Sequence, residues 1–570
     1  MPNIVEQLDA KISEALSGWN LYTTVLALVV FAYIAYPIVF HDEPDTHPML
    51  LARQASASPV RQPGESAVYR SLEVPHGYPL KTGLNVKEPD APKWSGGKDG
   101  DLRDIWRQVA KGAHSELGGS SVPAGKILTV LGKEDIKDHD VGDISREINI
   151  IGKHIQQHGG TRVAIYLPNS IEFLSTVFAC AFYGLSPILI PYNQPFDIVL
   201  ELLQKTGADC LVAAAGALPL ADVGQRVSSL KEIVWVVEKS SRQMDWHQKP
   251  EGTGNRVGVS VWHDLVLDQK RATSVELPTN EQGSKPANIT TIWQKKQGAM
   301  GEVVEFTQQN MVAAIAAQIS ALPARQRMSP SDLFLPADAF THAYVLTLTL
   351  AALFSHASIA ITSVASPGVD LSLVTRNVAP TIIVASAETA ASLHSATHST
   401  ATSGLKKFAY YTETKALAGG RMPTDTLLTR LNAPIRAAVG STPGKLRLLF
   451  VSERVGAGSP PLTSEQLSDL RVFTGARVIY ALTAAQVAGA VSQTSIFDYR
   501  REEGRSGKHS HFGIPLSSVE VKLVDTLTHR TTDKGNPEGE ITVLGPAVAG
   551  GKAALGVMGT FRADHTLAYV

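Results

Sequence analysis

The sequence predicts an α/β protein in which helices wind around a mostly parallel sheet, preceded by one transmembrane helix. Two observations support this prediction. Apolar, strand-like runs alternate with segments of helical spacing along most of the 570 residues, and such a chain is long enough for a large buried core. In addition, no charged side chain occurs from Ala15 to Phe40.

The uncharged stretch follows a short N-terminal segment (1–20) and is most apolar over residues 21–40. A helix needs about 20 apolar residues to cross the hydrocarbon core of a bilayer. Aromatic residues near both ends, such as Trp19 and Tyr36, are typical of membrane interfaces. A cleaved signal peptide would need a basic start and small residues at the cut, which this sequence lacks. We therefore expect a single-pass anchor over 21–40, with a buried terminal helix as the alternative.

Charge and cysteine content limit the environment and the partners. The net charge of −1 gives no electrostatic reason to expect nucleic acid. The only cysteines, Cys180 and Cys210, both lie in apolar runs, which favours a reducing compartment over a secreted disulfide framework. The sequence thus predicts a cytosol-facing body on the endoplasmic reticulum or the mitochondrial outer membrane.

Residues 41–100 are rich in Pro, Gly and polar residues and predict an extended lead-in, and regular order begins at 101. Helices and strands then alternate, as expected for a parallel sheet: Ile144–Gln157 (helix), Arg162–Leu167 (strand), Ile171–Gly184 (helix), Pro187–Pro191 (strand), Phe196–Thr206 (helix) and Asp209–Ala213 (strand). Further strands are expected at 359–362, 381–384, 446–451 and 477–480, and short alternating ones at Val519–Val524 and Glu540–Leu544. The Ser/Thr/Ala/His-rich stretch Ala390–Gly404 predicts a surface loop.

Several segments carry a family resemblance. Arg162–Asp209 resembles the opening of AMP-binding enzymes, in which a strand ending in Pro-Asn leads to a helix and a second strand. The resemblance continues in order through Asp332–His342 (the family's Pro-Leu-x-His), Leu446–Leu470 (around a Ser-Gly-Gly), Gly513–Asp525 and Pro537–Pro546. The chain is thus identified as similar to the adenylate-forming superfamily, most of all to the N-terminal domain of long-chain acyl-CoA synthetases.

This resemblance implies a fold and a chemistry. The fold would be two helix-flanked, mostly parallel sheets plus a small β-rich subdomain over 101–570. Because the sequence stops at Val570, near the family's hinge, we expect the family's C-terminal domain to be absent. The family's chemistry is acyl adenylation followed by thioester formation, which uses ATP, Mg²⁺ and CoA.

The family's phosphate-binding loop is altered here. The helix that follows it in the family matches Thr307–Asn310, so the loop corresponds to residues 294–303. The hydroxyl residues of the family loop are missing, and Glu302 stands where the family has lysine. A carboxylate at this place would repel a triphosphate. Lys295 and Lys296 either hold phosphate as point charges or are two solvated lysines.

The other nucleotide motifs are also altered. In the family's Tyr-Gly-x-Thr-Glu, Tyr480 and Thr483 are kept, but Ala484 replaces the glutamate that binds magnesium. Val557 stands where the family's aspartate binds ribose. The resemblance therefore leaves no catalytic residue and no metal site. The candidate remnants of an adenosine, phosphate or acyl site are Tyr480, Thr483, His342, Lys295 and Lys296.

Three hypotheses about function follow. The first is a membrane-anchored pseudoenzyme that needs no cofactor and acts as an acyl-binding or scaffolding protein for protein partners. The second is a long-chain fatty-acid–CoA ligase with an altered ATP site, which would use ATP, Mg²⁺ and CoA and receive the missing domain from a partner. The third is an accessory subunit of a membrane complex.

Overall fold

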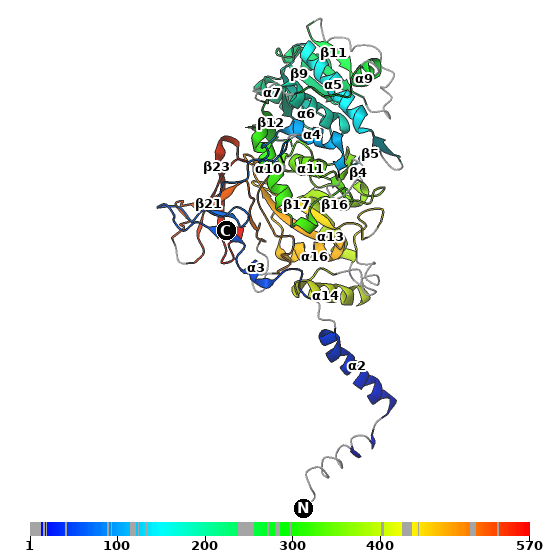
Figure 1. Cartoon of the computed structure of the whole chain (residues 1–570), viewed down its shortest axis with the longest axis vertical. Helices are drawn as coiled ribbons and strands as arrows, with labels where there is room; N and C mark the ends of the chain where they lie inside the picture. Colours follow the sequence, from blue (N-terminus) through cyan, green and yellow to red (C-terminus); the bar gives the residue numbers. More distant parts are fainter. Residues whose placement is uncertain are drawn as a thin grey trace, which may run out of the picture. The chain divides into compact units, whose positions relative to one another are not determined.

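The structure is a computed structural model that describes residues 13–14, 17–18, 20–39, 43–87, 91–92, 94–114, 121–122, 125–131, 135–237, 256–270, 273–279, 286–296, 298–400, 404–423, 436–442, 444–501, 509–532 and 535–570. The chain divides into two compact units, Met1–His47 and Pro48–Val570. The first contains helix α2 (Leu21–Val39), and the second contains every sheet (Figure 1).

The first unit corrects the predicted anchor. Within the described residues, no helix combines the length and the apolar character that crossing a membrane requires. The described helix α2 has 19 residues. Its first turn is polar, because Thr23 and Thr24 both donate their hydroxyls to the carbonyl of Asn20. The predicted transmembrane helix is therefore wrong, and the single-pass membrane localisation that rested on it loses its support.

A seven-stranded sheet forms one layer of the second unit, with the order β11-β10-β9-β7-β8-β12-β13. Its strands are β7 (Arg162–Tyr166), β8 (Ser186–Leu189), β9 (Cys210–Ala214), β10 (Glu232–Val236), β11 (Gly258–Val261), β12 (Ile289–Trp293) and β13 (Glu302–Phe306). All neighbours pair in parallel except β12 and β13. The helices that accompany it in sequence are α5 (Val141–Gln157), α6 (Ile171–Tyr183), α7 (Phe196–Thr206), α8 (Leu220–Arg226) and α9 (Trp262–Gln269).

Both faces of this sheet are buried. Along β7, Val163 and Ile165 pack into one apolar cluster, whereas Ala164 and Tyr166 pack into another. Alternate side chains of a strand point to opposite faces, so each face has its own core. This explains why the strand sequences are continuous apolar runs rather than alternating ones.

A nine-stranded sheet has the order β20-β19-β18-β17-β16-β14-β15-β5-β6. Its strands are β5 (Ile127–Leu131), β6 (Asp135–His139), β14 (Leu333–Pro336), β15 (Ser358–Thr362), β16 (Ile382–Ser386), β17 (Leu448–Arg454), β18 (Arg477–Thr483), β19 (Ala490–Gln493) and β20 (Ile514–Pro515). The six strands from β18 to β5 in this order pair in parallel. The other helices of this unit include α4 (Leu102–Lys111), α10 (Gln308–Ser320), α11 (Ala343–Phe354), α12 (Leu371–Val374), α13 (Ala387–Thr400), α14 (Gly404–Ala418) and α16 (Ser464–Thr474).

The predicted loop at 390–404 is wrong, because α13 covers most of it. Alanine has the highest helix propensity. The hydroxyls of Ser395 and Thr397 each bond to the carbonyl four residues earlier, which satisfies them within the helix.

A six-stranded antiparallel sheet has the order β1-β2-β21-β22-β23-β24. Its strands are β1 (Ala55–Ala57), β2 (Tyr69–Ser71), β21 (Glu520–Val524), β22 (Glu538–Leu544), β23 (Lys552–Phe561) and β24 (Leu567–Tyr569). The sheet thus joins strands from segment 41–100 to the C-terminal region. The remaining elements are α3 (Pro48–Ala52), two short 3-10 turns, and a β3 (Ala113–His114) and β4 (Ser121–Val122) pair. The α/β architecture with two mostly parallel sheets and a small β-rich part is confirmed.

Candidate functional site

A cavity of about 900 Å³ lies where the carboxyl ends of the two parallel sheets meet. Its lining comes from segments that follow β7, β8, β12, β14, β15, β16 and β17, such as 191–194, 339–343 and 452–459. In sheets of this kind, ligands bind outside the carboxyl ends of the strands. The topology therefore places this cavity where a ligand site is expected.

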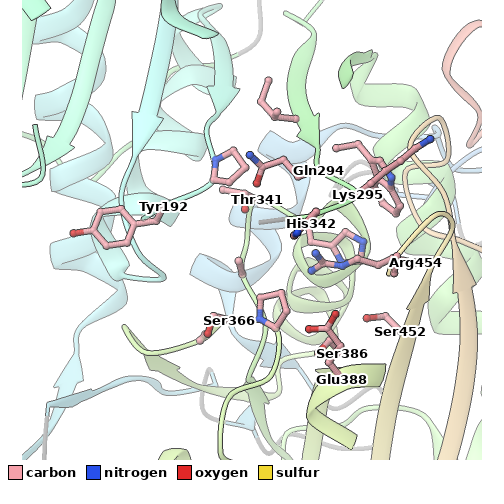
Figure 2. Close-up of a pocket in the computed structure, with 18 of the residues that line it drawn as sticks. Tyr192, Gln294, Lys295, Thr341, His342, Ser366, Ser386, Glu388, Ser452 and Arg454 are labelled. Atoms are coloured by element: carbon pink, nitrogen blue, oxygen red, sulfur yellow. The ribbon is translucent and has the colours of Figure 1, made fainter. Parts of the chain in front are cut away.

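Three cationic side chains line the cavity: Lys295, Lys296 and Arg454. Figure 2 shows Lys295, His342 and Arg454 gathered on one side of it, with Tyr192 on the opposite side. Neither lysine has a hydrogen-bond or ion-pair partner among the described residues. The stem of Lys295 packs on the loop after β17, because a Cβ at Gly456 would lie 3.2 Å from its Cδ.

Arg454 is held at one end only. Its Nη2 donates to Oδ2 of the buried Asp338 at 2.8 Å. Its Nε is buried and has no partner within the described part of the chain. One guanidinium donor therefore remains available beside the cavity.

His342 is buried directly before α11 and also lines the cavity. Neither of its ring nitrogens has a hydrogen-bond partner among the residues that the structure describes. The Asp338 carboxylate lies 3.8 Å away, too far for a hydrogen bond. Burial, aided by the charge of Arg454, lowers the pKa of His342 well below its usual value. The neutral imidazole therefore offers one unused donor and one unused acceptor.

Glu453 is a buried carboxyl in the cavity wall. Burial raises its pKa to about 7, and the hydrogen bond from Tyr480 opposes this rise only in part. The Tyr480 hydroxyl donates to Oε2 of Glu453 at 2.6 Å and accepts from the amide of Leu462 at 2.9 Å. The Thr483 hydroxyl donates to the carbonyl of Glu453 at 2.7 Å.

The structure thus separates the five residues predicted for the site. His342, Lys295 and Lys296 line one cavity, whereas Tyr480 and Thr483 lie behind its wall and support Glu453. Sequence reasoning did not single out Glu453 and Arg454. Their signal was present, because they stand in the segment that resembles the family's Ser-Gly-Gly, where two charged side chains replace glycines.

Glu302 does not line the cavity. It is exposed at the start of β13, where its carboxylate accepts a hydrogen bond from the side chain of Gln486. Ala485, which precedes Gln486 in the sequence, lines the cavity and brings no charge to it. The cavity therefore combines cations that attract an anion with the carboxyls of Glu388 and Glu453, and it gains no magnesium ligand from Ala484 or Ala485.

Comparisons with known proteins support the fold and identify one region of the sequence. A family model described as AMP-binding enzyme matches residues 303–551. The anthranilate CoA ligase AuaEII, solved with anthranoyl-AMP, has a TM-score of 0.55 at 14% identity, covering 85% of this chain and 79% of that chain. The long-chain-fatty-acid–CoA ligase FadD1 of Archaeoglobus fulgidus has a TM-score of 0.54 at 14% identity, covering 86% of both chains. No curated protein matches the sequence.

A third solved structure corrects the expectation of a missing C-terminal domain. VinN has a TM-score of 0.55 at 14% identity, and the match covers 83% of this chain and 98% of that chain. No domain-sized part of that solved chain is left unmatched, so this comparison gives no sign of a missing domain. At such low identity these structures establish the fold and not the substrate. Residues 303–551 thus match the AMP-binding enzyme family, and the chain has the fold of solved CoA ligases.

Proposed function

We propose that this chain binds an organic carboxylate of the acyl or aryl class in the cavity and does not convert it to an adenylate. The observation that carries this proposal is the convergence of Lys295, Lys296 and Arg454 on one cavity. Two of the solved structures named above are CoA ligases, one of anthranilate and one of long-chain fatty acids, and both substrates are carboxylates.

The free donors favour a carboxylate. The Nε of Arg454 and the protonated ring nitrogen of the neutral His342 are donors that are buried without partners in the described structure. An unpaired buried polar group costs about 1–3 kcal/mol, so a ligand that accepts these hydrogen bonds recovers that cost. Charge-assisted bonds to a carboxylate are about twice as strong as neutral ones. A ligand carboxylate beside Arg454, within reach of Lys295, satisfies both requirements.

The same site is poorly equipped for ATP. In the family, a lysine and a magnesium-binding glutamate balance the charge of the phosphates. Here their places are taken by Glu302, which bonds to Gln486 outside the cavity, and by Ala484. The missing charges favour binding without adenylation.

One observation favours a second function, that of a CoA ligase with an altered ATP site. Lys295 and Lys296 both line the cavity, so they could replace the family's phosphate ligands. This function would require ATP, Mg²⁺ and CoA, and it predicts that ATP affinity depends on the two lysines.

Calorimetric titration of the full chain distinguishes the two. The titrants are anthranilate, benzoate, a long-chain fatty acid, ATP–Mg²⁺ and a non-hydrolysable acyl-adenylate mimic. The variants are Lys295→Ala and Arg454→Ala, with Lys205→Ala on the exposed face of α7 as the matched control.

We expect at least one carboxylate to bind, the Lys295→Ala and Arg454→Ala variants to weaken it about tenfold or more, and the control to bind as the unaltered chain does. ATP–Mg²⁺ should give no heat. Binding of ATP–Mg²⁺ that depends on Lys295, or steady formation of acyl-CoA, would refute the non-catalytic proposal. No binding of any carboxylate would refute the carboxylate site.

A further inference from the structure

Three potential metal ligands meet far from the cavity. His154 and His158 lie one turn apart at the C-terminal end of α5, and Glu232 is the first residue of β10. Each side chain offers one ligand atom, and these atoms all lie within 4.8 Å of one another. His154 and Glu232 are 7% and 1% exposed, whereas His158 is exposed. The group is therefore a buried pair with one solvent-facing member.

The hydrogen bonds of His158 prepare it to ligate. Its Nδ1 lies 2.8 Å from the carbonyl oxygen of His154. A carbonyl only accepts, so Nδ1 carries the proton and donates. In the neutral ring the lone pair is then on Nε2. Metal-ligating histidines usually donate their other nitrogen to a carbonyl or carboxylate in this way.

Glu232 has one satisfied and one unsatisfied oxygen. Oε1 accepts from Ser260 Oγ at 2.6 Å and lies 3.0 Å from Nε2 of His154. Oε2 is buried and has no partner among the described residues. It occupies the space beside Gly258, where a Cβ would lie only 1.9 Å from it.

A buried carboxylate oxygen without a donor is costly, and a bound cation is one recognised way of satisfying it.

We propose that His154, His158 and Glu232 form a binding site for a divalent transition metal of the zinc class. Two imidazoles and one carboxylate are ligands that Zn²⁺ prefers, and paired histidines four residues apart on a helix are a frequent source of them. Tetrahedral Zn²⁺ with bonds of about 2.0–2.1 Å separates its ligand atoms by about 3.3 Å. The three groups therefore need to approach by about 1.5 Å at most, which the exposed His158 side chain can supply by rotation.

The location indicates a structural role for the metal. Glu232 starts β10, so the site lies at the amino ends of the parallel strands, whereas the cavity lies at their carboxyl ends. The metal would clamp the end of α5 to the sheet. Three protein ligands leave one position for water or for a further ligand from outside.

The test uses the full chain, freed of metal with a chelator and then titrated with Zn²⁺ and with Co²⁺, whose visible absorption reports coordination. We expect one metal ion per chain and a rise in the thermal unfolding midpoint when Zn²⁺ is added. His158→Ala should weaken Zn²⁺ binding about 100-fold and abolish the rise. Because His158 is exposed, this variant should keep the metal-free stability of the parent. Glu232→Gln removes the carboxylate and should have the same effect on binding.

The matched control is His398→Ala, which removes an exposed histidine from α13 and should change nothing. The proposal is wrong if the full chain binds no Zn²⁺ at millimolar concentration. It is equally wrong if the metal-free His158→Ala chain, shown to be folded by an unchanged urea midpoint, binds Zn²⁺ as tightly as its parent.

Discussion

Replacing Glu453 with glutamine should remove part of the pH dependence of stability. Burial raises the pKa of Glu453 from 4.5 to about 7. The folded chain therefore holds this proton more tightly than the unfolded chain does. The stabilisation is complete below pH 4.5 and is lost as the pH rises through about 7.

The structure sets the size of the effect. Each pKa unit corresponds to about 1.4 kcal/mol, so the rise from 4.5 to about 7 amounts to about 3 kcal/mol of unfolding free energy. Glutamine has nearly the shape of the protonated acid and does not titrate. The variant should therefore gain about 3 kcal/mol relative to its parent between acidic pH and pH 8.

Urea unfolding followed by tryptophan fluorescence, at several pH values from 4.5 to 8, measures this difference. Burial also raises the pKa of Glu147 to about 7, so only the difference between variant and parent isolates Glu453. Glu201→Gln, at an exposed position on α7, is the control and should leave the profile unchanged. If the profiles of Glu453→Gln and its parent are parallel, Glu453 does not bind its proton as argued, and the reasoning fails.

Three further predictions concern the scaffold. Arg447→Ala should lower the unfolding free energy, measured by urea unfolding, by about 2 to 3 kcal/mol. The reason is that the buried Asp332 carboxylate loses the two hydrogen bonds of 2.7 and 2.8 Å that Arg447 donates. A loss below about 0.5 kcal/mol would contradict this. Gly513→Ala should cost at least about 3 kcal/mol, since a Cβ would lie 1.9 Å from the carbonyl oxygen of Gln493. Gly184→Ala has the same φ of 68° but open space around it, so it should lower the unfolding free energy by only about 1 kcal/mol. Equal losses for the two variants would show that the steric clash at Gly513 does not set the cost. Both cysteine thiols are buried, and burial raises the pKa of each, so neither should react with Ellman's reagent at pH 8 until urea unfolds the chain; rapid reaction of the folded chain would refute their burial.

Local patterns in the sequence determined many elements of the fold. The predicted strand Arg162–Leu167 corresponds to β7, and the predicted helix Ile171–Gly184 to α6. Continuous apolar runs and helical spacing are properties of neighbouring residues, so they can be read without knowing the rest of the structure. The family resemblance also pointed to His342, Lys295 and Lys296, which lie together because the carboxyl ends of both parallel sheets meet at the cavity.

Other features depended on contacts between distant segments, which no local pattern contains. Residues 41–100 predict an extended lead-in, yet Tyr69 pairs with Val521 in the antiparallel sheet. Tyr480 was predicted beside a ligand, but it lies behind the cavity wall, bonded to Glu453.

The candidate metal ligands also divide into those that the sequence places together and one that only the tertiary structure adds. Helical spacing alone places His154 and His158 on one face, but only the pairing of β10 with β9 brings Glu232 to them. The sequence by itself determined which segments become helices and strands and which family they resemble. The tertiary structure decided which side chains are buried, charged or left without partners. The physical reason is that hydrogen-bond satisfaction and desolvation depend on what packs against a residue, and those neighbours lie far away along the chain.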